Sequence, residues 1–310
     1  MIGRLFSRTS RSGIGIVTIA LPLSMFVILS FTASSFFTAQ NLGNVGNQIT
    51  ALLIVSLGQL IVAISGGVDL SVGSMLSLTS AIIVTFDPAI VVPLAIAVGC
   101  VLGVVNGLGV AVFGVHPLVM TLATGTFVQG LTLLVSPVPG GEVAPAIEAL
   151  AHGRLFGLQP SLFWCAAAIL LCWLLLARST FGLRLYALGA NPRSAVLNGV
   201  KVVGPIIVCY VLCSLAAVAA GIFLTARVST GDPTIGAAFG LDSITAIALG
   251  GVQLSGGVGS VPGVILGVVT LGLATNGMNL LGVSPFLRMA ATGLLLLGAV
   301  SLQRRKTIGV

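Results

Sequence analysis

The sequence predicts an all-α membrane protein with about ten transmembrane helices, one of them short or broken, and an internal pseudo-repeat. Of its 310 residues, 57% are hydrophobic and 6% are charged, whereas soluble proteins carry about 25% charged residues. The mean hydropathy is +1.20. Apolar runs long enough to cross a bilayer core of about 30 Å recur from end to end. We therefore expect residues 1–310 to form a single membrane domain.

An eight-residue glycine motif occurs twice. The first glycine motif, residues 66–73, reads GGVDLSVG, and the second, residues 250–257, reads GGVQLSGG. Paired glycines and polar residues disfavour a continuous hydrophobic helix. Helix breaks that recur in both halves of a membrane protein are candidate points of movement. The residues expected to form this gate or hinge are Gly66, Gly67, Asp69, Ser71, Gly73, Gly250, Gly251, Gln253 and Ser255.

Ten apolar segments surround these motifs. Their expected ranges are 14–33, 49–65, the run from the first glycine motif to 86, 90–113, 118–135, 162–177, 203–225, 241–252, 261–281 and 285–302. Residues 41–48 form an amide-rich link between the first two segments. The stretch 241–252 is short, and its expected form is a half-spanning or broken helix. The longest loop, 136–160, has room for a short helix.

Basic residues predict the orientation. If all ten segments cross, the cytoplasmic side holds Arg4, Arg8, Arg11, Arg178, Arg184, Arg193, Lys201, Arg304, Arg305 and Lys306. Only Arg154, Arg227 and Arg288 fall outside, a strong positive-inside bias. We therefore expect a cytoplasmic N-tail (1–12), a periplasmic loop (136–160), a cytoplasmic loop (178–202) and a cytoplasmic C-tail (303–310). Both glycine motifs then lie toward the cytoplasm.

Asp69 allows two compatible interpretations. A carboxylate at a helix centre in lipid costs about 2.5–3.5 kcal/mol. If Gly66 and Gly67 end one helix, Asp69 or Ser71 can cap the next and offset this cost. The alternative is a part in gating or coupling.

The cytoplasmic loop is predicted to contain a two-turn surface helix. Asn191 is a good N-cap, Pro192 suits the first helical position, and Gly199 suits the C-terminal stop. Helices this short are marginal alone in water, so we expect it to dock on a partner. Its candidate docking residues are Asn191, Pro192, Arg193, Ala195, Asn198 and Gly199.

Enzyme, metal-binding and nucleic-acid-binding functions find little support. The sequence lacks a phosphate-binding G-x-x-x-x-G-K-[ST] motif and a nucleophile–base constellation. Its five cysteines lie within apolar runs without metal-site spacing. The net charge of +7 comes from residues at segment ends rather than from a basic soluble face.

Uncharged polar side chains within the apolar segments suggest a solute path. Amides in lipid usually face the bundle interior, where they join helices or line a path. The candidates are Gln59, Asn106, Gln129, Asn276 and Asn279. With Asp69 as the sole predicted membrane carboxylate, a neutral polyhydroxyl solute suits such a path better than a charged one.

Residues 66–74, GGVDLSVGS, resemble the signature of ribose-type ABC transporter permeases, the sugar branch of the branched-chain amino acid permease superfamily. Four more stretches resemble the family in the same order along the chain: 41–42 with 47–48, 116–124, 181–200, and 250–263 with 276–283. The resemblance spans nearly the whole chain. One departure is Pro192-Arg193, where the family often has acidic residues after the asparagine.

The resemblance implies an importer subunit in a bacterial inner membrane, with both termini cytoplasmic. Its implied partners are a second permease subunit, identical or related, a cytoplasmic ABC ATPase and a periplasmic sugar-binding protein. ATP and Mg²⁺ would bind the ATPase, with no cofactor in this chain. The helix at 191–199 would be the coupling helix, and the solute a pentose, hexose or related polyol.

Two alternatives remain open at this point. One is a permease of the same family for another small solute, such as a branched-chain amino acid. The other is an ion-coupled secondary transporter, for which Asp69 is the only candidate coupling carboxylate.

Overall fold

The structure, a computed structural model, describes residues 15–301. Within this range it consists of helices and loops, with two isolated β-bridges and no β-strand. The helices are α2 (Ile16–Thr32), α3 (Ala39–Ile64), α4 (Val72–Thr85), α5 (Val91–Ala111), α6 (Pro117–Val135), α7 (Pro145–Glu148), α8 (Pro160–Ala177), α9 (Thr180–Ala190), α10 (Pro192–Leu197), α11 (Val203–Val228), α12 (Phe239–Leu249), α13 (Val261–Leu280) and α14 (Pro285–Ser301). The predicted tails 1–12 and 303–310 lie outside the described residues.

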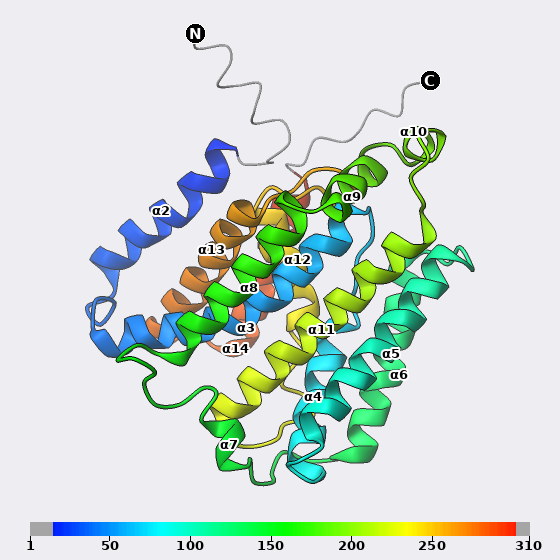
Figure 1. Ribbon diagram of the computed structural model, residues 1–310. Helices are drawn as coiled ribbons and strands as arrows, with labels where there is room; N and C mark the ends of the chain where they lie inside the picture. The colour runs from blue at the N-terminus through cyan, green and yellow to red at the C-terminus, as the bar shows by residue number, and fades with distance from the viewer. Residues whose placement is uncertain (1–14, 302–310) are drawn as a thin grey trace.

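The centre of the bundle is formed by α3 and α11. Every residue from Thr50 to Ile64 of α3 is buried, and α11 packs against α3, α4 and α5. On the other side of α3 lie α8, α12 and α13, with α2 against α13 and α14 against α12. Figure 1 shows α10 and α7 at opposite ends of the bundle, which agrees with the predicted separation of the loops that contain them.

Six helices in the described range, α3, α5, α6, α8, α11 and α13, are long and apolar enough to cross a membrane. The remaining apolar segments, α2, α4, α12 and α14, are shorter. The chain is therefore a multi-pass helical membrane protein, and ten crossings would require these four shorter helices to contribute as well.

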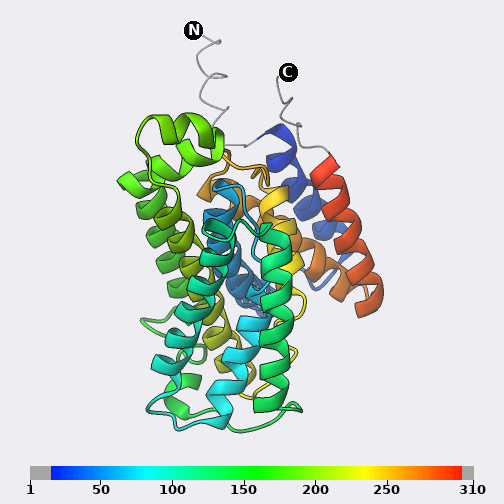
Figure 2. The ribbon, with the colours of Figure 1, turned by 90° about the vertical axis from the view of Figure 1, so that its right-hand side faces the viewer.

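Two of the short helices begin inside the bundle. With 14 and 11 residues, α4 and α12 are about 21 and 16 Å long at 1.5 Å per residue, less than the bilayer core. Their N-terminal ends meet, because a Cβ on Gly73 would lie 2.6 Å from the Gly236 carbonyl oxygen. From this contact they run apart, with α12 above α4 in both Figure 1 and Figure 2.

A non-helical segment that contains turns precedes each short helix. Residues 65–71 lead from the end of α3 to α4, and residues 229–238 lead from α11 to α12. The second segment is held along α4, since Ser77 and Ser80 accept hydrogen bonds from the amides of Gly236 and Asp232 at 2.9 and 3.1 Å. Non-helical backbone is tolerated at membrane depth only when its polar groups are satisfied in this way.

The structure corrects one element boundary. Residues 41–48, predicted as a link, belong to α3, which begins at Ala39. Thr38 Oγ1 accepts from the Asn41 amide at 3.2 Å and starts the helix. The Asn41 and Asn276 side chains then bond to each other at 2.8 and 3.2 Å. The amides thus join α3 to α13 instead of forming a loop.

Candidate functional site

The first glycine motif starts with a helix-ending turn. Gly66 has φ of +89°, a left-handed conformation suited to glycine. The amides of Gly66 and Gly67 donate to Ala63 and Val62 carbonyls, which closes the end of α3. A Cβ on Gly67 would lie 2.6 Å from the Tyr210 hydroxyl oxygen. The prediction that this glycine pair ends a helix is confirmed.

Buried side chains satisfy the backbone that follows. With its side-chain oxygen turned toward the Asp69 N–H, the Gln59 amide accepts from that N–H at 3.1 Å and donates to the Asp69 carbonyl at 3.3 Å. Thr121 Oγ1 accepts from the Leu70 N–H at 3.1 Å, and the Tyr210 hydroxyl donates to the Val68 carbonyl at 3.4 Å. The first glycine motif is thereby held between α3, α6 and α11.

Asp69 belongs to a chain of buried hydrogen bonds at the start of α4. Its Oδ1 accepts from the Ser71 amide at 2.9 Å and the Ser71 hydroxyl at 2.5 Å. Asn106 Nδ2 donates to Ser71 Oγ at 2.9 Å, and Thr124 Oγ1 donates to Asn106 Oδ1 at 2.7 Å. Asp69 and Asn106 are fully buried. Asp69 therefore binds Ser71, the residue that precedes α4, and no side chain caps the first turn of that helix. The predicted helix cap is not formed, and a role of Asp69 in gating stays a prediction.

Replacing Gln59 by leucine is expected to destabilise the protein. The substitution leaves the buried N–H and carbonyl of Asp69 without their partner, at about 1–3 kcal/mol for each group. Thermal unfolding of the detergent-purified protein measures the loss. Ser56→Ala is the matched control, because Ser56 lies on the same helix and its buried hydroxyl has no hydrogen-bond partner. Equal melting temperatures for the Gln59→Leu variant and the wild type would contradict this account of Gln59.

The two motifs meet at one point, which we call the glycine junction: Ile64, Gly66, Gly189, Gly256 and Gly257. The Gly257 amide donates to the Ile64 carbonyl at 2.9 Å. A Cβ on Gly256 would lie 3.0 Å from both Gly66 Cα and the Gly189 carbonyl oxygen, and a Cβ on Gly189 would clash with the Ile64 carbonyl oxygen. Three backbone segments, from α3, α9 and the second glycine motif, are thus in direct contact.

The second glycine motif ends α12 with a turn like that of the first. Gly251 has φ of +77°, and the Gly251 and Val252 amides donate to carbonyls of α12. The structural equivalent of Gly66 is therefore Gly251, one position later than the sequence alignment suggests. The second motif is followed three residues later by α13, which begins at Val261. Ser260 caps this helix by accepting from the Gly263 amide.

The predicted two-turn helix is confirmed as α10. The Asn191 side chain caps it by accepting from the Ser194 amide at 3.0 Å, and Gly199 has φ of +79°. Ala195 is buried, whereas Arg193 and Asn198 are exposed. Sequence reasoning missed α9, which Ser179 caps and which ends at Ala190, immediately before α10. Its Tyr186 hydroxyl donates to the Gly259 carbonyl at 2.8 Å. The element expected to dock on a partner is therefore attached to the glycine junction.

The predicted path residues separate into three places. Gln59 and Asn106 are buried around the first motif, as described above. Gln129 donates to the carbonyl of Pro233, which belongs to the segment that precedes α12, at 2.9 Å. Asn276 bonds to Asn41, and exposed Asn279 accepts from Arg288 at 2.8 Å. Their participation in a solute path stays a prediction.

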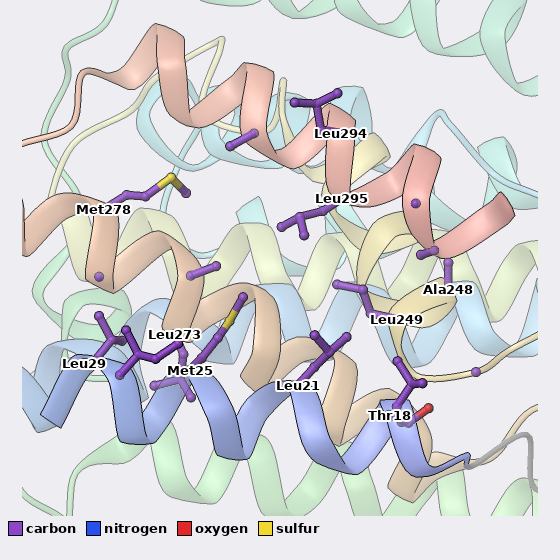
Figure 3. A pocket seen from close by; sticks show the side chains of 18 of the residues that line it. Thr18, Leu21, Met25, Leu29, Ala248, Leu249, Leu273, Met278, Leu294 and Leu295 are labelled. Atoms are coloured by element: carbon purple, nitrogen blue, oxygen red, sulfur yellow. The ribbon is translucent and has the colours of Figure 1, made fainter. Parts of the chain in front are cut away.

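A cavity of about 1060 Å³ lies between α2, α12, α13 and α14. Figure 3 shows Leu21, Met25 and Leu295 pointing into it. Gln253 of the second motif and Thr18 are among its few polar lining residues. An apolar lining suits hydrocarbon better than a polyhydroxyl solute, which needs hydrogen-bond partners throughout.

The described residues form a helical bundle in which two non-helical segments, residues 65–71 and 229–238, are held between helices by hydrogen bonds. Among the described residues, no group of three or more His, Cys, Asp or Glu side chains could hold a metal ion. Residues 41–300 match the family model described as branched-chain amino acid transport system / permease component. The chain belongs to this permease family.

Curated relatives resemble the chain over nearly its full length. It is 35% identical to the ribose import permease protein RbsC of Bacillus subtilis (strain 168), over 91% of this chain and 90% of that protein. It is 34% identical to the L-arabinose transport system permease protein AraH of Escherichia coli (strain K12), over 91% and 88%. The galactose/methyl galactoside import permease protein MglC of the same strain is 29% identical over 92% of both chains. No solved structure matches the chain significantly.

Proposed function

We propose that this chain is the membrane permease subunit of a binding-protein-dependent ABC importer for a monosaccharide. The observation that carries the proposal is its near full-length similarity to permeases named for ribose, L-arabinose and galactose. A pentose, hexose or related polyol is therefore favoured over the branched-chain amino acids that appear in the family's description.

The proposed assembly contains a second permease subunit, a cytoplasmic ABC ATPase with ATP and Mg²⁺, and a periplasmic sugar-binding protein. Both termini and α10 would face the cytoplasm of a bacterial inner membrane, and α7 the periplasm. The chain would cross the membrane ten times if two conditions hold. The helices α2 and α14 would each span the bilayer, and α4 and α12 would each cross it together with the non-helical segment that precedes them. The separation of α10 from α7 supports this orientation (Figure 1).

The glycine junction supports a specific route for coupling. ATP binding would draw the ATPases together, and α10 would move with them. Because α9 contacts Ile64 and the second glycine motif through Gly189, this movement would reach the ends of α3 and α12. Both helices end in glycine turns, where a change of direction is least strained. The movement would thereby alternate access to the solute path.

Uptake of labelled D-ribose, L-arabinose and D-galactose tests the proposed function. Cells producing the chain with its partner subunits should import at least one of these sugars. Import should stop when the ATPase is inactivated and persist when the ion gradients are collapsed. The reverse pattern would favour the secondary-transporter alternative, and import of L-leucine alone would favour the amino acid alternative.

Leu197→Asp is expected to prevent docking of the ATPase. Leu197 is 81% exposed at the end of α10, and an apolar side chain so exposed on a short helix suits a protein contact. The aspartate would place a buried charge in the contact with the ATPase. The amount of ATPase that co-purifies should therefore fall tenfold or more, and each factor of ten corresponds to a loss of about 1.4 kcal/mol in binding free energy. Leu155→Asp, at the opposite end of the bundle, is the control. Undiminished co-purification with the Leu197→Asp variant would contradict this role of α10.

A further inference from the structure

Three polar side chains, on the neighbouring helices α12, α13 and α14, lie outside the residues of the two glycine motifs. Asp242 lies in the first turn of α12, Arg288 in the first turn of α14, and Asn279 near the end of α13. Arg288 Nη1 donates to Asn279 Oδ1 at 2.8 Å. The helices that carry Asp242 and Arg288, α12 and α14, pack together. We call these residues the polar triad.

The triad extends inward from one end of the bundle. The short turn between α13 and α14 lies next to Asn279 and Arg288. Asp242 is deeper, because α12 begins where Gly236 meets Gly73 at the start of α4. Only Asp69 was predicted as a membrane carboxylate, because Asp242 stands at the very start of the predicted short stretch 241–252. In the structure Asp242 is a residue of an apolar helix, within the height of the bundle.

All three side chains of the triad are at least partly exposed. Asn279 is exposed, and Asp242 and Arg288 are partly exposed. Charged side chains of membrane helices usually face a water-filled cavity or a protein interior, because their contact with lipid is costly. An aqueous path beside α12 and α14 would provide such surroundings for the triad.

The chemistry of the triad fits a neutral sugar. The carboxylate accepts hydrogen bonds from hydroxyl groups, the guanidinium donates up to five, and the amide does both. The opposite charges of Asp242 and Arg288 cancel, so the triad need not concentrate ions of either sign. This composition differs from the neighbouring cavity between α2 and α14, whose lining is mostly apolar.

We propose that Asp242, Asn279 and Arg288 bind the sugar as it passes along the wall of the translocation path. This inference rests on the proposed function and identifies residues that contact its solute. It also gives α12 a role in the transport movement. The same helix carries Asp242 at one end and leads into the second glycine motif at the other, so movement at the glycine junction would shift Asp242 relative to Arg288.

The test compares Asp242→Asn and Arg288→Gln in the complete importer, with Thr126→Ala as the control. Thr126 is an exposed polar residue of α6 whose hydroxyl bonds within its own helix. Initial uptake rates are measured for labelled D-ribose, L-arabinose, D-galactose and L-leucine. Membrane abundance and ATP hydrolysis stimulated by the binding protein are measured in parallel.

Sugar uptake should fall by about tenfold or more in both triad variants, as expected for loss of a hydrogen bond to a charged group. Abundance and stimulated ATP hydrolysis should stay within about twofold, and the relative rates for the three sugars should change. Hydrolysis without transport separates a sugar contact from a structural role, since a misfolded subunit would lose both.

Several results would overturn the site. The first is sugar uptake close to that of the wild type in both variants. The second is a loss of membrane abundance that matches the loss of uptake. The third is wild-type uptake of all three sugars by the charge-exchanged Asp242→Arg, Arg288→Asp double variant. The last result would identify a purely structural ion pair. If the wild type itself imports none of the three sugars, the proposed function fails and the site fails with it. Import of leucine by the wild type, in place of sugar, would reassign the triad to a zwitterion.

Discussion

Gly189→Val is expected to abolish ATP-driven uptake. Even a Cβ at this position would clash with the Ile64 carbonyl oxygen, and it would lie 2.6 Å from the Gly257 amide nitrogen. These neighbours are backbone atoms, which cannot rotate away as a side chain would. Either α9 separates from α3 or the Gly257–Ile64 hydrogen bond breaks. In both cases, movement of α10 no longer reaches the two glycine motifs.

We expect uptake by this variant to fall at least about a hundredfold, equivalent to 2.7 kcal/mol or more in the transport step. The ATPase should still co-purify, because the exposed face of α10 is unchanged. Gly130→Ala is the matched control, since a Cβ there meets nothing within 4 Å and alanine favours the helical conformation. Near-normal uptake by the Gly189→Val variant would show that the glycine junction does not carry the coupling.

Asp69→Leu is expected to be the second most damaging substitution. It removes the acceptor for the Ser71 amide and hydroxyl at the beginning of a helix that starts inside the bundle. Each buried donor left without a partner costs about 1–3 kcal/mol. The variant should therefore reach the membrane in reduced amounts and show little uptake.

Asp69→Asn distinguishes a structural hydrogen-bond acceptor from a chemically active carboxylate. Asparagine keeps an oxygen that can accept from Ser71, so membrane abundance and most of the uptake should be retained. Western blotting of membranes and initial sugar uptake measure the two quantities. Loss of uptake at normal abundance would assign Asp69 a role that needs its charge, beyond its hydrogen bonds to Ser71.

Much of the helical arrangement could be predicted from local signals. Hydrophobic runs located the main segments, and the Asn191, Pro192 and Gly199 pattern located α10 to within one or two residues. The Gly66–Gly67 pair marked the end of α3. These features depend on residue type and on neighbours in sequence, so a single sequence contains the necessary information.

Long-range contacts could not be predicted in this way. The meeting of α4 and α12 depends on Gly73 and Gly236, which are far apart in the chain. Gly189 lies in a stretch that resembles the permease family, but nothing local indicates that it contacts Ile64. The amide of Asn41 was read as a loop residue because its partner, Asn276, comes near only in the folded chain.

The same limit applies to the candidate site residues. Gln59 and Asn106 were recognised as unusual in apolar segments, yet their partners in the first motif emerge only from the packing of α3, α5 and α6. Asp242 and Arg288 stand near the starts of the predicted segments 241–252 and 285–302, and nothing local relates one residue to the other. Their proximity requires the specific packing of α12 against α14.

The central claim is that α10 and the second glycine motif move together through the glycine junction. Spin labels at Asn198→Cys and Ser255→Cys, both exposed positions, measure one distance across the junction. A second pair at Asn198→Cys and Leu155→Cys measures the distance between the ends of the bundle. In the complete importer, trapping the ATP-bound state should change the second distance and leave the first unchanged. A first distance that changes while the second stays constant would contradict the account.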